Sequence, residues 1–258
     1  MPAIDFLPRK LFNAFSRMGE QEPLKGLLAL LGNPEYCSFW DDHIGTRTGT
    51  WPAGTPYAST IGTGTEVIGL TSGLNGTMTL TTGNGGSDTA GQGLGLNWNG
   101  DSGFYFIARC KMGRITSSKF EIGMTDAVND DGAVAVKGTP TFTADDCALF
   151  VFDTTDDTNV TFVSNGGTTD ANADAGLTLV ADTYFVVEIV GRGPTDTTGD
   201  NVVGFLNGVQ VGSGNINGAN RLTPWAYVED LATSTATVFT VDYWGCIGPR
   251  GAAWGIST

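Results

Sequence analysis

The sequence predicts an all-β protein, an antiparallel β-sandwich preceded by a short helical arm. Three observations support this fold class. The 258 residues include 38 glycines and only 16% charged residues, where about 25% is usual. After residue 34 the apolar residues alternate with polar ones or form short runs, which indicates strands. Turn signals rich in Gly, Asn and Asp separate these runs without any helical period between them, which argues against an α/β fold.

Residues 1–34 differ from the rest of the chain and predict two short helices. Asp5 can cap the first helix, and Pro8 is tolerated in its first turn. A second helix is expected over residues 23–31. The apolar residues expected to anchor this arm are Phe6, Leu7, Leu11, Phe12, Phe15, Leu27 and Leu28. Because helices this apolar are not stable alone in water, the arm must pack on the sandwich, on another copy or on a partner.

The remainder divides into an extended lead-in, residues 35–64, and the sandwich, residues 65–258. Strands are predicted at 65–70, 77–82, 103–109, 119–124, 148–153, 160–164, 184–190, 202–206, 209–212, 226–229 and 237–243. The clearest local prediction is a hairpin at Asn207-Gly208, because a type I′ turn requires positive φ at both central residues. So many short strands predict a sandwich or a barrel.

The charge of the chain is acidic and unevenly distributed. Residues 1–34 carry four basic and three acidic residues, and the remainder carries nine basic and 24 acidic residues. A body so acidic repels phosphate, so we expect no nucleic-acid partner. The charge suits a component exposed at high local density, or serves solubility alone. Neither a signal-peptide layout nor a stretch long enough to span a bilayer is present in the sequence, so we expect synthesis in the cytoplasm and no membrane partner.

The cysteines and the histidine give little support to catalysis or zinc binding. Cys37, Cys110, Cys147 and Cys246 form no C-x-x-C pair, and we expect reduced, buried thiols, with one disulfide as the alternative. His43 is the only histidine, whereas an activated Ser or Cys needs an imidazole base and a zinc site needs several ligands close together.

Six segments occur in an order that is typical of one family. They are FYFIARCK at 104–111, FEIGMTDA at 120–127, CALFVFD at 147–153, TYFVVEI at 183–189, FLNGVQVG at 205–212 and TVDYW at 240–244. In this order they resemble strands of the concanavalin A-like lectin/glucanase jelly rolls, the group that includes laminin G-like domains. This version is similar to domains of tailed-phage structural proteins, such as capsid decoration proteins and fibres. The resemblance implies a jelly roll of two curved antiparallel sheets, used as an assembly and surface module.

The resemblance also allows a test for glycanase activity. Glycanases of this group commonly carry E-x-D-x-x-E on one strand, and strand alternation places the first two carboxylates on one face. The corresponding strand here offers Glu121, followed by Gly123 where an acid is expected, and Glu188 stands alone on its own strand. We therefore predict that the protein is not an enzyme.

Two ligand classes remain as alternatives. Calcium would need acidic loops, and the candidates are Asp126, Asn129, Asp130 and Asp131 in one loop and Asp153, Asp156, Asp157 and Asn159 in another. Because Asp and Asn also cap turns, we expect no cofactor. A glycan would need an exposed aromatic side chain, and Trp98 between Asn97 and Asn99 is the best candidate.

These inferences combine into one functional prediction. We expect a non-enzymatic structural protein located at the capsid surface of a virion, a decoration or cement protein of a tailed phage. Its arm would attach to the major capsid protein or to further copies in a homo-oligomer. The alternative is a carbohydrate-binding, lectin-like module of a phage fibre or adhesin.

Overall fold

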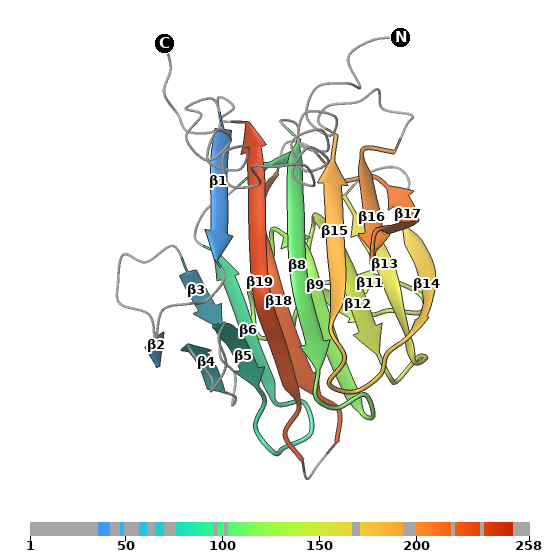
Figure 1. Ribbon diagram of the computed structural model, residues 1–258. Coiled ribbons are helices and arrows are strands. Elements are labelled where there is room, and N and C mark those ends of the chain that lie inside the picture. Colours follow the sequence, from blue (N-terminus) through green and yellow to red (C-terminus); the bar gives the residue numbers. More distant parts are fainter. Residues whose placement is uncertain are drawn as a thin grey trace.

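The computed structural model describes residues 36–41, 47–48, 57–60, 65–69, 76–94, 98–100, 103–166, 171–192, 200–217, 220–232 and 235–249. These residues form two antiparallel sheets packed face to face (Figure 1), which confirms the predicted all-β jelly-roll sandwich. The helical arm predicted for residues 1–34 lies outside the described residues. In the ranges that are described, no helix has the length and apolar character needed to cross a bilayer.

The first sheet contains nine of the described strands and faces the viewer in Figure 1. Its order is β17 (Val209–Gly214), β16 (Val202–Leu206), β15 (Phe185–Gly191), β8 (Phe104–Met112), β19 (Val238–Pro249), β5 (Thr77–Thr81), β4 (Thr65–Gly69) and β2 (Arg47–Thr48). A further strand, β1 (Tyr36–Asp41), pairs with the end of β19, where Tyr36 lies opposite Pro249.

The second sheet contains eight of the described strands and lies behind the first. Its order is β14 (Asn172–Thr178), β13 (Asn159–Asn165), β12 (Cys147–Asp153), β9 (Ser118–Thr125), β18 (Arg221–Asp230), β6 (Thr89–Leu94) and β3 (Tyr57–Thr60). Strand β7 (Trp98–Asn99) pairs with the start of β18.

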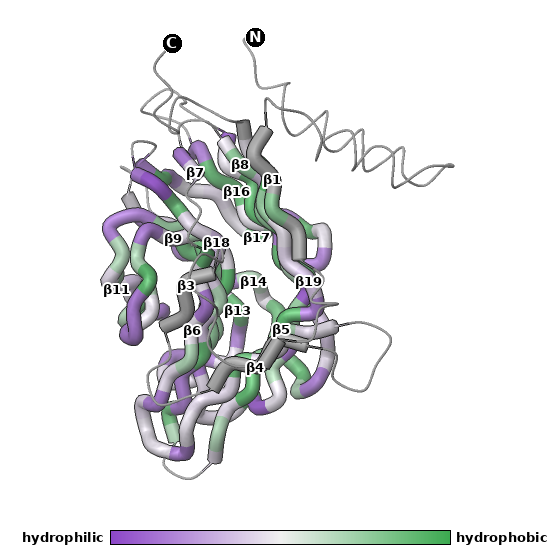
Figure 2. Tube along the Cα trace, turned by 90° about the vertical axis from the view of Figure 1, so that its left-hand side faces the viewer, coloured by the Kyte–Doolittle hydropathy of each residue, from purple (hydrophilic) through white to green (hydrophobic). Residues whose placement is uncertain are grey.

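A short hairpin forms a third layer. Strands β10 (Val134–Val136) and β11 (Thr141–Phe142) pair only with each other. Figure 2, a view from the side, shows β11 beyond β9 and β18, on the side of the second sheet that faces away from β19. The outer face of the eight-stranded sheet is therefore partly covered by the chain itself.

The main core lies between the two sheets and is rich in phenylalanine. Alternate residues of β8 are buried, as expected for a strand with one face toward a core. Phe120 of β9 stacks on Phe239 of β19, with ring centroids 4.9 Å apart, and on Phe152 of β12 at 5.8 Å. Burial of each such side chain contributes about 1.5–3 kcal/mol, so these contacts hold the sheets together.

Two local predictions can be compared directly with the structure. Asn207 has a φ of 52° and Gly208 a φ of 77°, and Leu206 lies opposite Val209, which confirms the predicted hairpin. Residues 35–64 differ from the predicted lead-in, because β1 and β3 lie within this range and pair inside the two sheets. The sandwich therefore begins well before residue 65.

The cysteines lie in the interior where they are described. Cys110 and Cys147 are buried free thiols, and burial raises the pKa of both. Cys246 is 2% exposed and belongs to the main core, whereas the side chain of Cys37 lies outside the described set. For Cys110 and Cys147 the structure agrees with the prediction of reduced, buried thiols.

Candidate functional site

The candidate site lies on the outer face of the eight-stranded sheet. On β9, Phe120 and Ile122 point into the main core, so Lys119 and Glu121 point outward. Residues 126–146, which include the β10–β11 hairpin, fold over this outer face. They bury a second apolar cluster of Ala133, Val134, Ala144, Cys147, Leu149, Val151, Val163, Trp225 and Tyr227. This covering segment therefore lies over part of the outer face.

Glu121 is the central polar residue beneath the covering segment. Its side chain is 0% exposed, and its carboxylate accepts hydrogen bonds from the backbone N–H groups of Ala133 at 2.7 Å and Val134 at 3.0 Å. The indole N–H of Trp225 donates to the same carboxylate at 3.2 Å. Because three protein donors surround the carboxylate, Glu121 acts as a clamp that holds the hairpin on the sheet.

Lys119 completes this clamp. Its ammonium donates to the Val134 carbonyl at 2.5 Å and forms ion pairs with Glu121 at 3.2 Å and Glu229 at 3.5 Å. Burial by itself lowers the pKa of Lys119, but the negative charges of Glu121 and Glu229 outweigh this effect, and the pKa is raised. Lys119 is 3% exposed, so a paired positive charge is held inside the protein.

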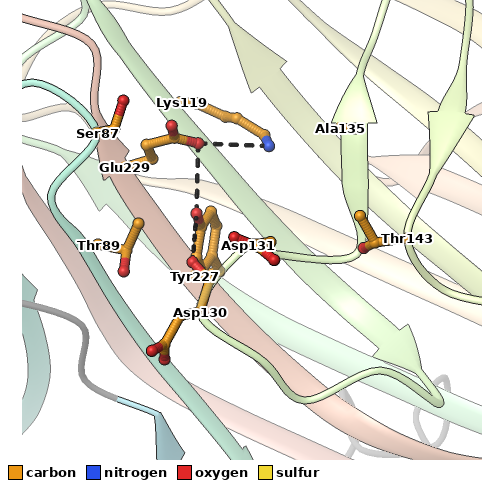
Figure 3. Close-up of a pocket in the computed structure, with 9 residues that line it drawn as sticks. All are labelled: Ser87, Thr89, Lys119, Asp130, Asp131, Ala135, Thr143, Tyr227 and Glu229. Atoms are coloured by element: carbon orange, nitrogen blue, oxygen red, sulfur yellow. Dashed lines mark hydrogen bonds and ion pairs between the residues drawn. The ribbon is translucent and has the colours of Figure 1, made fainter.

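A cavity of about 580 Å³ lies beside the clamp (Figure 3). It is lined by Ser87, Thr89, Lys119, Asp130, Asp131, Ala135, Thr143, Tyr227 and Glu229. The hydroxyl of Tyr227 donates to Glu229 at 3.3 Å and to the Asp130 carbonyl at 3.2 Å. Burial raises the pKa of Tyr227, and the negative charge of Glu229 adds a smaller increase. Hydroxyl and carboxylate groups of this kind can hydrogen-bond a polyhydroxylated ligand.

Gly123 explains why the acidic motif is incomplete. Its φ is +151°, and a Cβ at this position would lie 2.4 Å from the Ala148 carbonyl oxygen and 2.7 Å from Ile189 Cδ1. Real Cβ atoms do not approach other atoms so closely. The position where the glycanases carry an acid therefore requires glycine here.

Glu188 lies far from Glu121 in the architecture. It belongs to β15 of the nine-stranded sheet, where it accepts a hydrogen bond from the Tyr105 hydroxyl at 2.5 Å. The two acids that the sequence singled out thus lie on different sheets and point to opposite sides of the sandwich. The structure does not bring them together across a groove.

The acidic loops make internal contacts. Lys137, only 1% exposed, donates to Asp157 at 2.6 Å and to the Asn159 carbonyl at 3.0 Å. In the other loop, the Asn129 side chain accepts from the Asp131 N–H at 3.0 Å, as in an Asx turn. Among the described residues, no group of three or more His, Cys, Asp or Glu is arranged to hold a metal ion.

The structure corrects one expectation about glycan contacts. Trp98 is 3% exposed and packs in the main core, so its ring does not form an exposed platform. Asn99 is half-buried on β7, and Asn97 lies outside the described residues, as do His43 and the predicted anchoring residues of the arm.

The sequence reasoning missed the residues that build the cavity. Lys119, Tyr227 and Glu229 come from strands about a hundred residues apart in the chain, so no local motif joins them. One signal was present: Lys119 and Glu121 carry opposite charges two residues apart in an otherwise apolar strand, which places them on one face.

Comparison with known proteins gives the fold class. No family model and no curated protein matches the sequence. The structure is similar to a protein of unknown function from Shewanella oneidensis MR-1, with a TM-score of 0.57 and 11% identity over 89% of this chain and 94% of that one. It is similar to the carbohydrate recognition domain of Emp47p, with a TM-score of 0.52 and 8% identity over 80% and 95%. It is also similar to a β-glucanase of Bacillus licheniformis, with a TM-score of 0.51 and 14% identity over 83% and 98%. At these identities the shared feature is the concanavalin A-like jelly roll.

Proposed function

We propose that this chain is a non-enzymatic structural protein of a virus particle, a decoration or cement protein attached to the major capsid protein of a tailed phage. The observation that carries the non-enzymatic part is the clamp. Glu121, the acid on the strand where glycanases of this fold carry theirs, accepts two backbone N–H groups and is closed off from solvent by the chain's own hairpin. A catalytic carboxylate instead has to reach a substrate.

The charge and the arm support the structural role. The body, residues 35–258, carries nine basic and 24 acidic residues, so it stays soluble when many copies are crowded together. The arm supplies apolar anchors such as Leu11, Phe15 and Leu27, and each buried side chain of this kind contributes about 1.5–3 kcal/mol. On a symmetric shell, avidity multiplies such contacts without any covalent bond.

The test is electron microscopy of virus particles prepared with and without the full-length chain. The expected result is additional density on the outside of the shell, which is lost when Leu11 and Phe15 are replaced by Glu in a chain that remains folded. Particles whose surface is the same in the presence and absence of the chain would contradict the proposal.

A second candidate function, carbohydrate binding, is favoured by the cavity. Asp130 and Asp131, both exposed, line the opening and supply carboxylate groups, and a carbohydrate recognition domain is among the similar structures. A glycan array with the wild-type protein and the Asp130→Ala variant tests it, with Asp145→Ala, an exposed acid outside the cavity, as the control. Binding by neither the wild type nor the control contradicts this candidate.

A further inference from the structure

The outer face of the nine-stranded sheet is apolar along one line across its strands, whereas Arg109 and Lys111 make it charged further along β8. On β8 the buried residues Phe104 and Phe106 point inward, so Tyr105 and Ile107 point outward and are half-buried. On β15 the same alternation directs Val190 outward. An antiparallel sheet with one solvated face usually carries polar side chains at such positions. This apolar line therefore has the composition of a surface that is covered.

The apolar outward residues form a continuous row across neighbouring strands. Val203 of β16 lies opposite Val190, Val190 lies opposite Tyr105, and Tyr105 lies opposite Ile247 of β19. Ile247 in turn lies opposite Ser38 of β1. Directly opposite residues have Cβ atoms about 4.5–5.5 Å apart, so the row forms one stripe that ends beside β1.

Burial extends onto this outer face toward both ends of the row. Ile247 is 8% exposed and Val203 is 1% exposed, although neither belongs to the clusters that fill the interior. The polar group within the row is also satisfied, because the Tyr105 hydroxyl donates to Glu188 at 2.5 Å. The row can therefore accept an apolar partner without leaving a buried hydroxyl unpaired.

We propose that this row is the docking surface for residues 1–34 of the same chain. The arm joins the sandwich at Tyr36, only two residues before Ser38, so it enters at the end of the row. From β1 to β16 the row crosses four strand spacings, or about 19 Å at 4.7–4.9 Å each. A helix of about 13 residues has the same length, and the arm has room for one between Asp5 and the second helix predicted at 23–31. The apolar face of this first helix, with Leu7, Leu11 and Phe15, would lie along the row.

The charges favour the arm over the sheet of a second copy as the occupant. Two copies packed through this face would bring together two chains of net charge −14 each, which repel one another. The arm carries four basic and three acidic residues, so it adds no negative charge. Docking also keeps the apolar residues of the arm out of water in the free protein. The inference concerns the free protein and does not rest on the proposed virion role, in which the arm would leave the row to reach the capsid.

Limited digestion with trypsin tests the docking, because the arm contains cleavage sites at Arg9, Arg17 and Lys25. In the wild-type protein we expect these sites to be protected. Replacement of Val190 by Asp places a charge in the middle of the row, and we expect cleavage of the arm to become at least about tenfold faster, because cleavage follows the population of the open form. The control is Val209→Asp, at a hairpin position that is 68% exposed.

A second variant protects the test against misfolding of the sheet. Leu11→Asp changes only the arm, and we expect the same acceleration while the melting temperature of the body is kept. Three results would overturn the proposal. Arm sites that are cut equally fast in the wild type and in both variants show that nothing is docked. Acceleration by Val209→Asp as large as that by Val190→Asp shows that the row is not the surface. Protection that increases with protein concentration shows that the arm docks on another copy.

Discussion

Replacement of Glu121 by Gln tests the clamp most directly. The substitution keeps the size of the side chain and removes its charge. In the structure the carboxylate accepts from Ala133 N–H at 2.7 Å, Val134 N–H at 3.0 Å and Trp225 Nε1 at 3.2 Å, and it neutralises Lys119 at 3.2 Å. A Gln side chain has only one acceptor oxygen, so its amide group would face at least one donor. The variant thus loses acceptors and a counter-charge together.

The magnitude follows from these contacts. Breaking a buried ion pair by removal of one partner costs about 3–5 kcal/mol, and a buried donor left without an acceptor costs about 1–3 kcal/mol. Glu229, 3.5 Å from the Lys119 ammonium, keeps part of the compensation. We therefore expect the free energy of unfolding to fall by about 3 kcal/mol, which lowers the melting temperature of a chain of this size by about 6–12 °C.

Thermal and urea unfolding of the full-length chain measure this effect. The matched control is Glu188→Gln, which makes the same chemical change on the outer face of the other sheet. Glu188 is half-buried and accepts from the Tyr105 hydroxyl, and a Gln oxygen can accept the same bond. We expect the control to lose less than about 1 kcal/mol.

The opposite result would refute the reasoning. Catalytic acids are held in unfavourable surroundings, so their removal usually leaves stability unchanged or raises it. If Glu121→Gln melts at or above the temperature of the control, Glu121 is not a structural clamp, and the glycanase interpretation returns. Loss of a measurable glycanase activity in the same variant would lead to that conclusion independently.

Three further predictions concern the same elements. Gly123→Asp, which restores the missing acid of the motif, should prevent folding rather than create an enzyme, because its Cβ would lie 2.4 Å from the Ala148 carbonyl oxygen; a soluble variant with a cooperative melt would contradict this. Lys137→Met should lower the free energy of unfolding by about 1–3 kcal/mol, since Lys137 bonds Asp157 and the Asn159 carbonyl from a buried position, and urea titration checks it. The folded-state pKa of Tyr227 is raised above its ordinary value of 10.0. The stability that the neutral hydroxyl contributes is therefore present below pH 10 and is lost as the pH rises above that value. Between pH 8 and 11.5, the melting temperature of the Tyr227→Phe variant should fall less steeply than that of the wild type.

The strands that the sequence predicted well are those whose pattern is set by the main core. The run at 202–206 and the hairpin at Asn207-Gly208 agree with the structure, because strong apolar alternation and specific turn chemistry act locally. Strand β6, with the sequence TAGQGL, was missed because glycine and glutamine are weak strand formers. It forms a strand because its backbone pairs with β18, which is far away in the sequence.

The candidate site was harder to predict than the fold. Glu121 was identified from its position on a strand, but its partners Ala133 and Val134 lie in a loop whose return over the sheet has no local signature. Trp98 was the best candidate for an exposed glycan contact, with core or interface packing as the other interpretation, and the structure places its ring in the main core. In both cases the deciding contacts come from packing between distant segments, which residue spacing alone does not encode.

The covering segment and Glu121 depend on each other. Residues 126–146 bury Trp225 and Tyr227 against the outer face of the second sheet, and the hairpin can lie so close only because its backbone N–H groups find an acceptor in Glu121. In this arrangement the Glu121 carboxylate faces the covering segment. The missing acid at Gly123 has a separate cause, because a Cβ there would lie 2.4 Å from the Ala148 carbonyl oxygen, although both features act on the same strand, β9.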